Sequence, residues 1–463
     1  MENILYTGFS RVDITPEEYT NLAGYGNDSY RKCNQILDRV FGTCIALRDE
    51  QGETVILCTA DLLNAVKHTV VEGARRAIHQ ATGVAEDHIS VSVTHTHAGP
   101  SMYSWEEPMT NRFLTRYCKQ MAKAAKEALE DLKPSEIRIG QRIVPQMTFV
   151  RHYIGRDGTI FGPNFGKWDR ETKARADISD DQLQVMRFVR EGGRDIVLVN
   201  WQSHATITGG MKDENGRYVP AYRMSADWPG AMRNHVEGCT GCHCAYFQGA
   251  CGNLIPFSLI KGEGVEDRDD HMLYGRTMAE NVLDCLKEDM RSVKTGPIRT
   301  VQYQFEGQVN HADDHRVEDA KTVQKGFYEI TDLAERRAKL NRYGFNSVLH
   351  ANAVVNRSRL GKTQEMELLA VGIGDISFAT TPIEMFNSNG RYVKDNTPYE
   401  MTFMCAYSNG SHSYIPDEKA FGYDCYELNS CRFLKGTGEE IAKTHIKLLN
   451  QLKSDSVDSN VTP

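Results

Sequence analysis

The chain has 463 residues, of which 40% are hydrophobic and 25% charged, and its formal net charge is −8 at pH 7. This composition is typical of a globular protein, and an acidic chain without a basic patch is a poor candidate for binding nucleic acid. No apolar run approaches the roughly 20 residues that cross a bilayer, and the opening MENILYTGFSRVDITP lacks the basic start and apolar core of a signal peptide. We therefore expect a cytoplasmic protein with mostly reduced cysteines and no membrane span.

The first hundred residues predict strands, a helix and a loop-rich start. Gly24 and Tyr25 lie in the opening loop NLAGYGND, where glycine allows close backbone approach, and we assign them to substrate binding. FGTCIALR and TVILCTA flank a turn at 50–52 and predict a hairpin. Asp61 follows the second strand, where an acidic residue most often caps the next helix. Apolar spacing predicts that helix over 64–82.

A strand at 89–93 leads into the stretch VSVTHTHAGP, residues 91–100. Side chains alternate along a strand, so we expect His95 and His97 to project from one face, about 7 Å apart at the backbone. Two adjacent imidazoles at a strand end are suited to binding a metal or to transferring protons. Taken alone, this motif has an equally good interpretation: one histidine forms hydrogen bonds in the core and the other is solvated.

The remaining elements alternate between helix and strand. QLQVMRFVRE and DIVLVNWQSHAT predict a hairpin whose second strand ends at His204, the same placement as His95, and α/β sheets often build sites from several strand ends. The sequence further predicts helices over 111–132, in SADWPGAMRNHVE, near 270–288, over about 313–343 and over 438–452, and strands near 298–306, in ELLAVGIGDISFATTP and in MTFMCAYSNG. We expect an α/β fold of mixed sheets flanked by helices, with one domain over 1–452 and a polar tail over 453–463.

Two sets of residues could hold a metal. His95, His97 and His204, with Glu384 and Tyr414, offer nitrogen and oxygen ligands, although their wide spacing is not itself a motif. The competing set contains a C-x-x-C spacing, and inert buried thiols are the alternative to a structural zinc site there. That set consists of Cys239, Cys242, His243, Cys244 and Cys251. Cys251 as a nucleophile lacks an evident base.

Several motifs, in order, resemble those of the neutral (non-lysosomal) ceramidases. THTHAGP resembles the family's THTHSGP signature, and DITP…LAGYG, NWQSH, QGACGNLIP, TTPIEMF and SYIPDEKAFGYDCYE resemble its other segments, from about residue 5 to about 435. The resemblance implies a zinc ion held by His95, His204, Glu384 and Tyr414. It also implies that His97, Arg151 and Tyr426 bind and polarise a substrate amide.

The sequence departs from the family pattern at two positions near this site. Ile255 stands where the family has a serine, and Asn253 stands where it has an acid; we assign Asn253 to substrate binding. The secreted members' signal peptide and C-terminal immunoglobulin-like domain also have no counterpart in the sequence. The resemblance therefore suggests a bacterial ceramidase-like hydrolase of unassigned substrate.

The resulting hypothesis is zinc-dependent hydrolysis of an amide or ester, with zinc-bound water as the nucleophile. We expect a small polar substrate because the loops at 155–167 and 208–223 are hydrophilic. Whether the chain forms a homo-oligomer is left open. Three alternatives remain: an amidohydrolase barrel, which also opens with H-x-H; a non-catalytic ligand-binding relative; and a metal-dependent lyase, isomerase or sugar-processing enzyme.

Overall fold

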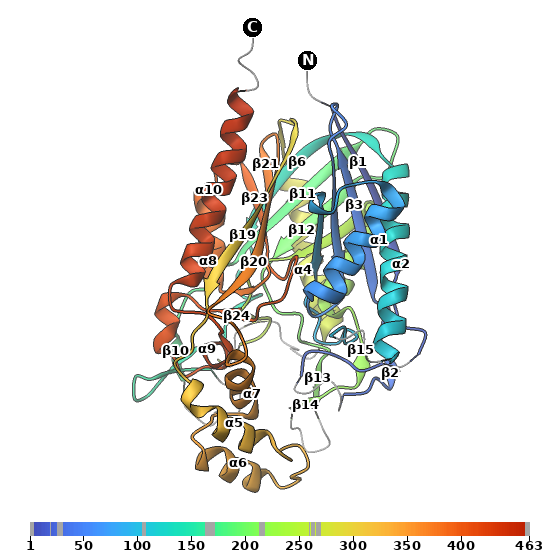
Figure 1. Cartoon of the computed structure of the whole chain (residues 1–463). Coiled ribbons are helices and arrows are strands. Elements are labelled where there is room, and N and C mark those ends of the chain that lie inside the picture. The colour runs from blue at the N-terminus through green and yellow to red at the C-terminus, as the bar shows by residue number, and fades with distance from the viewer. Residues whose placement is uncertain are drawn as a thin grey trace.

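The structure is a computed structural model, and it describes residues 4–18, 20–25, 31–103, 108–162, 172–212, 218–258, 260, 264 and 270–458. The described chain stacks four layers in the order helices, large sheet, small sheet, helices (Figure 1). This arrangement confirms the predicted α/β class with mixed sheets. It excludes the amidohydrolase barrel, because stacked open sheets replace a closed ring of parallel strands.

The large sheet has nine strands in the described part of the chain, in the order β16-β12-β11-β6-β1-β3-β4-β5, with β18 beside β6. Most neighbours are antiparallel, whereas β4–β5 and β12–β16 are parallel. The strands are β1 (Leu5–Asp13), β3 (Phe41–Arg48), β4 (Thr54–Ala60), β5 (Ile89–Val93), β6 (Lys133–Ile143), β11 (Gln182–Arg190), β12 (Ile196–Trp201), β16 (His243–Gln248) and β18 (Arg291–Val293). β5 and β12 are apolar-rich and buried throughout, as strands covered on both faces must be.

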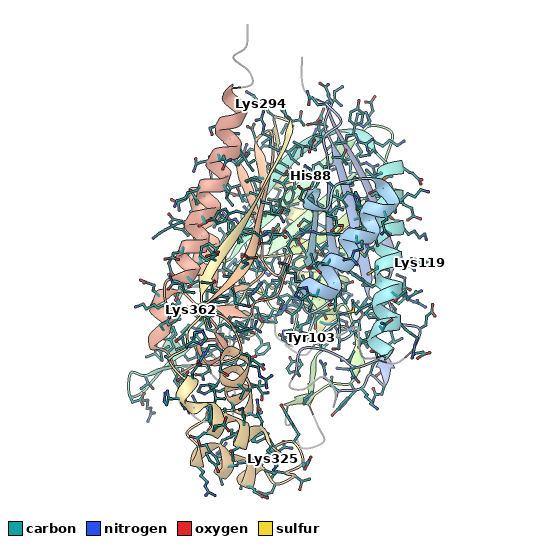
Figure 2. The ribbon with its side chains drawn as sticks, viewed as in Figure 1. His88, Tyr103, Lys119, Lys294, Lys325 and Lys362 are labelled. Atoms are coloured by element: carbon teal, nitrogen blue, oxygen red, sulfur yellow. The ribbon has the colours of Figure 1, made fainter. Side chains whose placement is uncertain are left out.

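The small sheet packs face to face on the large one. It comprises β19 (Ile298–Gln308), β20 (Thr363–Ile373), β21 (Ile376–Thr380) and β23 (Met401–Cys405), in that order. Aromatic side chains of both sheets meet between them, with the Phe247 and Phe378 ring centroids 6.2 Å apart and those of Phe378 and Phe403 5.5 Å apart. Side chains fill the space between the ribbons (Figure 2). Burial of this apolar area holds the two sheets together.

Helices cover both outer faces. α1 (Glu72–Thr82), α2 (Pro108–Glu130), α3 (Asp227–Thr240) and α4 (His271–Glu288) cover the large sheet, and α8 (Asn387–Asn396) and α10 (Thr437–Asp458) cover the small one. α10 extends beyond the helix predicted at 438–452 into the expected tail, whose last residues, 459–463, lie outside the described residues. Among the described residues, none of the helices combines the length and hydrophobicity that crossing a bilayer demands.

A helical insertion replaces the single long helix predicted over 313–343. It connects β19 to β20 and contains α5 (Val317–Gln324), α6 (Leu333–Arg342) and α7 (Val348–Arg357). The N-cap at Asp332 starts a new helix within the predicted range, because its side chain accepts a hydrogen bond from Glu335 N; Ser347, beyond that range, caps α7 by accepting from His350 N. The insertion has its own apolar core and lies at the lower end of the molecule, where Lys325 is labelled (Figure 2).

Two further local predictions are wrong. The helix expected from residue 64 begins instead with a π-helical turn, Lys67–Val71, before α1. Asp61 caps no helix; it lies buried after β4, and its two carboxylate oxygens accept hydrogen bonds from Arg233 at 2.9 and 2.7 Å. A charged partner on α3 satisfies this carboxylate more completely than a helix N-terminus would.

Short elements gather where the strands of both sheets end, low in Figure 1. They are β2 (Gln35–Ile36), β7 (Phe149–Val150), β8 (Tyr153–Gly155), β9 (Ile160–Phe161), β10 (Thr172–Arg175), β13 (Gly210–Lys212), β14 (Tyr218–Pro220), β15 (Arg223–Met224), β17 (Leu254–Ile255), β22 (Glu384–Met385), β24 (Tyr414–Ile415) and α9 (Tyr426–Ser430), with single turns at Asp314–Arg316 and Glu418–Gly422. A further single turn, Glu86–His88, directly precedes β5, at the other end of that strand (Figure 2). Most of the predicted site residues lie in or beside these elements.

Candidate metal centre

The large sheet brings two histidines together by curling. Its edge strands β5 and β16 contact each other, and Thr96 forms a β-bridge with Ala205. His95 follows β5 and His204 follows β12, the neighbour of β16, so both lie where the two edges meet. β12 ends at Trp201, and His204 therefore lies in the turn after the strand rather than at its last position.

The small sheet supplies a carboxylate and a phenol to the same place. Its parallel neighbours β21 and β23 lead into β22 and β24, which also pair in parallel, with Glu384 directly opposite Tyr414. A bridge between Ser92 of β5 and Ser408, beyond β23, ties this end of the small sheet to the large one. Each sheet thus contributes two of the four predicted ligands.

The ligand atoms are separated by the distances that one bound ion requires. Glu384 Oε2 lies 3.4 Å from His95 Nε2 and 3.6 Å from His204 Nε2. Tyr414 Oη lies 3.5 Å from His204 Nε2. Zinc bonds to nitrogen and oxygen of about 2.0–2.2 Å at tetrahedral angles place neighbouring ligand atoms about 3.3–3.6 Å apart. The structure therefore brings the four predicted ligands around one point.

All three histidines present the same ring nitrogen to this point. Each Nδ1 lies beside a backbone carbonyl oxygen, which can only accept a hydrogen bond, so Nδ1 carries the proton and Nε2 keeps its lone pair. The pairs are His95 Nδ1 to Leu63 O at 2.7 Å, His97 Nδ1 to Gly24 O at 2.9 Å and His204 Nδ1 to Leu254 O at 2.8 Å. This is the arrangement that orients metal-ligating histidines.

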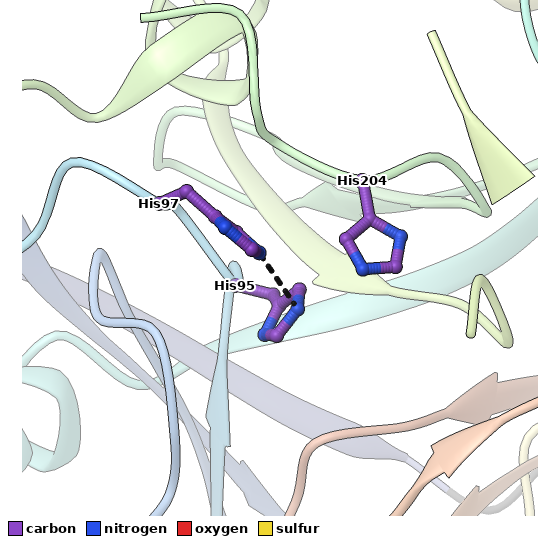
Figure 3. A group of neighbouring side chains, drawn as sticks. All are labelled: His95, His97 and His204. Carbon is purple, nitrogen blue, oxygen red and sulfur yellow. Dashed lines mark hydrogen bonds between the residues drawn. The ribbon is translucent and has the colours of Figure 1, made fainter. Parts of the chain in front are cut away.

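The converging lone pairs need a positive charge among them. His95 Nε2 and His97 Nε2 lie 3.2 Å apart (Figure 3), and Glu384 Oε2 is buried without a hydrogen-bond partner. Burial lowers the pKa of His97 well below its ordinary value and that of His204 to about 4, which disfavours protonated imidazole. Burial raises the pKa of Glu384, and its interactions with His95 and His204 lower that pKa by more, to below its ordinary value. A bound cation supplies positive charge without protonating a ligand, so the residues present fit a metal ion.

The turn that carries His95 and His97 is not a continued strand. β5 ends at Val93, and His95 has a left-handed φ of 60°, so the predicted strand alternation is wrong here. Tyr407 and Ser413 also have left-handed φ, 54° and 71°, and adjoin the same centre. Such strained backbone is concentrated at functional sites, where the surrounding structure maintains it.

Tyr407 is a site residue that the sequence did not reveal. Its ring stacks on that of His95, with centroids 3.9 Å apart and planes at 27°. Its hydroxyl lies 3.1 Å from Cys251 Sγ, and burial raises the pKa of both groups, so both stay protonated. Cys251 is thereby a poor nucleophile. An aromatic residue after a buried strand carries no signal that distinguishes this position from ordinary core.

Arg151 is buried beside Tyr414. It forms an ion pair with Glu427, donates from Nη2 to Gly252 O at 2.9 Å and lies over the Tyr414 ring, 5.4 Å from its centroid. Tyr426 packs on the other side of the group, with its ring centroid 5.4 Å from that of Tyr414, and burial raises the pKa of Tyr426 to about 12. Both residues are therefore at the centre, and Tyr426 retains its proton at neutral pH.

A second buried group, His152, Cys425 and Glu427, has ligand atoms close enough to hold a metal. Its carboxylate already has a permanent positive charge beside it, since Glu427 pairs with Arg151 and accepts a hydrogen bond from His152 Nε2 at 3.0 Å. Burial raises the pKa of Glu427, but Arg151 and then His152 lower it further, to about 2. A divalent ion here would have to displace a guanidinium, so this group supports Arg151 rather than a metal. Glu427 is a further residue that the sequence did not reveal; its one signal is its place beside Tyr426.

The three predicted substrate-binding residues lie near the centre in different ways. Gly24 O accepts the His97 hydrogen bond, and the Tyr25 ring lies edge-on to His97 with centroids 5.3 Å apart. Asn253 is buried; its Nδ2 donates a hydrogen bond to Asn387 Oδ1 at 2.7 Å, and its Oδ1 accepts one from Asn387 N at 2.9 Å. Their role in substrate binding stays a prediction. Ile255, in the position of the family serine, is buried in β17.

The cysteine-rich stretch does not assemble into a metal site within the described residues. Cys239 is exposed, whereas Cys242 and Cys244 are buried. The His243 ring stacks on Phe9, with centroids 4.3 Å apart, and thus packs against β1. The groups with converging ligand atoms include none of these residues. Inert thiols are the better interpretation.

The fold is shared with solved ceramidase structures. No protein-family model matches the chain. The crystal structure of neutral ceramidase from Pseudomonas aeruginosa superposes with a TM-score of 0.71 and 15% identity, over 98% of this chain and 75% of that one. A ceramidase complexed with C2 superposes with a TM-score of 0.70 and 14% identity, over 98% of this chain and 76% of that one. The resemblance seen in the ordered motifs is thus confirmed for the fold, which is that of the neutral ceramidases.

Proposed function

We propose that the chain is a zinc-dependent hydrolase that cleaves an amide or ester bond of a small polar substrate. The observation that carries the proposal is the convergence of the His95, His97 and His204 ligand nitrogens, with Glu384 Oε2 buried beside His95 and His204. Nitrogen and oxygen ligands at tetrahedral spacing suit zinc. The ceramidase structures of the same fold support hydrolysis as the reaction class.

His95, His204, Glu384 and Tyr414 would hold the ion. A zinc ion bound there would act as a Lewis acid toward an acyl oxygen and lower the pKa of a bound water to about 7. Burial raises the pKa of Tyr414 well above its ordinary value, and the Arg151 charge over the Tyr414 ring acts in the opposite direction, toward the ionised, ligating form. Glu427 pairs with Arg151 and holds it in place. The chain's part is to present these atoms in a dry, prearranged site.

His97 would transfer the proton, and Tyr426 would stabilise the negative charge on the acyl oxygen. His97 donates from Nδ1 to Gly24 O, so its Nε2 is free to accept a proton from the attacking water and return it to the leaving nitrogen or oxygen. Tyr426 keeps its proton and can donate a hydrogen bond to the developing oxyanion. Ile255 has no hydroxyl, so no acyl-enzyme forms at that position.

The test combines elemental analysis with a panel of N-acyl amides, esters and glycosides. We expect about one zinc per wild-type chain and cleavage of an N-acyl amide or an ester. His204→Ala should lose both zinc and hydrolysis, whereas His350→Ala, a buried histidine of the insertion, should retain both. Zinc and hydrolysis surviving in His204→Ala would refute the site. If the wild type binds zinc but cleaves only glycosides, the sugar-processing alternative would replace acyl hydrolysis. If it binds zinc and cleaves no compound of the panel, acyl hydrolysis would be refuted, and a lyase, an isomerase or a non-catalytic ligand-binding protein would take its place.

A further inference from the structure

Arg31 is a buried arginine that no motif singled out, and its side chain is 2% exposed. Its guanidinium donates to backbone carbonyl oxygens from segments far apart in sequence. The acceptors are Ala221 O at 2.8 Å from Nε, Ala23 O at 2.6 Å and His97 O at 2.7 Å from Nη1, and Gly209 O at 3.1 Å from Nη2. Because these hydrogen bonds go to main-chain carbonyl oxygens, they fix the backbone of several segments rather than the position of one side chain.

The carbonyls that Arg31 binds all lie on the segments that enclose His97. Ala23 precedes Gly24, whose own carbonyl accepts the His97 Nδ1 proton. Gly209 lies so close that a Cβ there would overlap the Tyr25 ring and come within 2.9 Å of His97 O. The guanidinium also lies over the Tyr25 ring, 5.1 Å from its centroid, on the side chain that meets His97 edge-on. Arg31 therefore holds His97 through its backbone, through its hydrogen-bond acceptor and through its ring neighbour.

The other two imidazoles are oriented independently of Arg31. His95 donates to Leu63 O, in the segment after β4, and His204 donates to Leu254 O, at the start of β17. The four carbonyl oxygens named above, to which Arg31 donates, lie instead around His97. Thus the carbonyls that orient the predicted ligands His95 and His204 lie on other segments than those that Arg31 holds around His97, the histidine assigned to proton transfer.

We propose that Arg31 is a positioning residue that orients the His97 imidazole for hydrolysis. The expected effect on the rate of hydrolysis rests on the proposed function. The expected effect on the orientation of the His97 ring rests only on the contacts described above. Arginine suits the task because its five donors lie in one plane and its charge is permanent. Lysine at this position keeps the charge but cannot reach carbonyls in several fixed directions, so it should restore the function only in part.

The kinetic test is a double-mutant cycle with Arg31→Met and His97→Ala, using 4-nitrophenyl acetate and the best amide of the panel as probes. Arg31→Met should lower kcat/KM about 10- to 100-fold, the usual effect of losing a group that orients a catalytic histidine. Zinc content should remain about one per chain, and Arg31→Lys should be intermediate. In the His97→Ala background the added Arg31→Met change should cost less than about 3-fold, because the two residues act as one unit. Additive losses, or loss of zinc in Arg31→Met, would overturn the proposal.

A second measurement does not depend on activity. Histidine Nδ1–H resonances of the zinc-loaded protein, labelled with ¹⁵N-histidine, report each imidazole separately. Arg31→Met should shift or broaden the His97 resonance and leave those of His95 and His204 in place. Arg75→Met is the matched control, since Arg75 is 7% exposed and is paired with Glu367 at 2.8 and 2.6 Å; it should leave all three unchanged. If the wild type hydrolyses no probe, the proposed function fails while this readout still decides the role of Arg31: an unmoved His97 resonance would refute it.

Discussion

Two buried groups of ligand-type residues lie at the same end of the molecule, and they differ in how their charges are satisfied. In the first, the Nε2 atoms of His95 and His204 lie 3.4 and 3.6 Å from Glu384 Oε2, and His97 Nε2 lies 3.2 Å from that of His95. In the second, Glu427 is bound by both Arg151 and His152. Residue type and proximity alone do not distinguish a metal site from a structural network. The distinguishing feature is whether a permanently charged side chain already pairs with the carboxylate: Arg151 pairs with Glu427, whereas the ion-pair contacts of Glu384 in the described part of the chain are with imidazoles.

The largest expected effect is on metal binding in the first group. Glu384→Gln should reduce zinc content to well below one per chain, because the amide removes the anionic ligand. Metal analysis of the purified variant beside the wild type measures the loss. Glu367→Gln is the control, a buried carboxylate paired with Arg75, and should keep its zinc; full zinc occupancy in Glu384→Gln would contradict the assignment.

The second group should respond in stability instead of metal content. Glu427→Gln breaks a buried ion pair with Arg151 and should cost about 3–5 kcal/mol of unfolding free energy, with zinc retained at saturating metal. The folded-state pKa of Glu427, about 2, lies below its ordinary 4.5, so its stabilising contribution is present above pH 4.5 and is lost as the pH falls toward 2. Denaturant unfolding of the zinc-free wild type and the zinc-free Glu427→Gln variant should therefore give unfolding free energies that approach each other as the pH falls through this range. A gap that stays constant with pH would argue against the ion pair.

A smaller effect is expected where the backbone approaches His97. Gly24 has a φ of +112°, and a Cβ there would lie 2.8 Å from the His97 Cα and Cβ atoms. Gly24→Ala should lower kcat/KM about 10-fold with zinc content unchanged, because it displaces the carbonyl that orients His97. Gly52→Ala is matched for backbone strain, with a φ of +90° and open space around the added Cβ, and should leave the kinetics unchanged. Equal effects in both variants would mean that general strain, not His97, explains the loss.

The smallest effect is expected in the cysteine-rich stretch. Cys242→Ser should change neither the zinc content nor the rate of hydrolysis, because the groups with converging ligand atoms do not include it. Elemental analysis of the purified variant beside the wild type measures this directly. A fall of about one zinc per chain would restore the structural zinc site that the spacing of Cys239 and Cys242 first suggested.

The sequence by itself determined the class of fold, most elements and the identity of the candidate residues. Apolar periodicity and turn residues act over a few positions, so they placed β3, β4, β5 and α4 close to where they form. The ordered motifs also indicated the fold that the ceramidase structures share. The same local reasoning failed for the insertion, because the N-cap at Asp332 starts a new helix inside a pattern that looked continuous over 313–343.

Only the tertiary structure decided which atoms face one another. The partners of the imidazole Nδ1 atoms are main-chain carbonyls, which every residue has and which therefore leave no trace in the sequence. Tyr407, Glu427 and Arg31 act across more than sixty positions, through contacts that periodicity cannot report. The curl of the large sheet and the parallel pairing of β22 with β24 bring donors from two sheets to one point, and that convergence is a property of packing rather than of any segment.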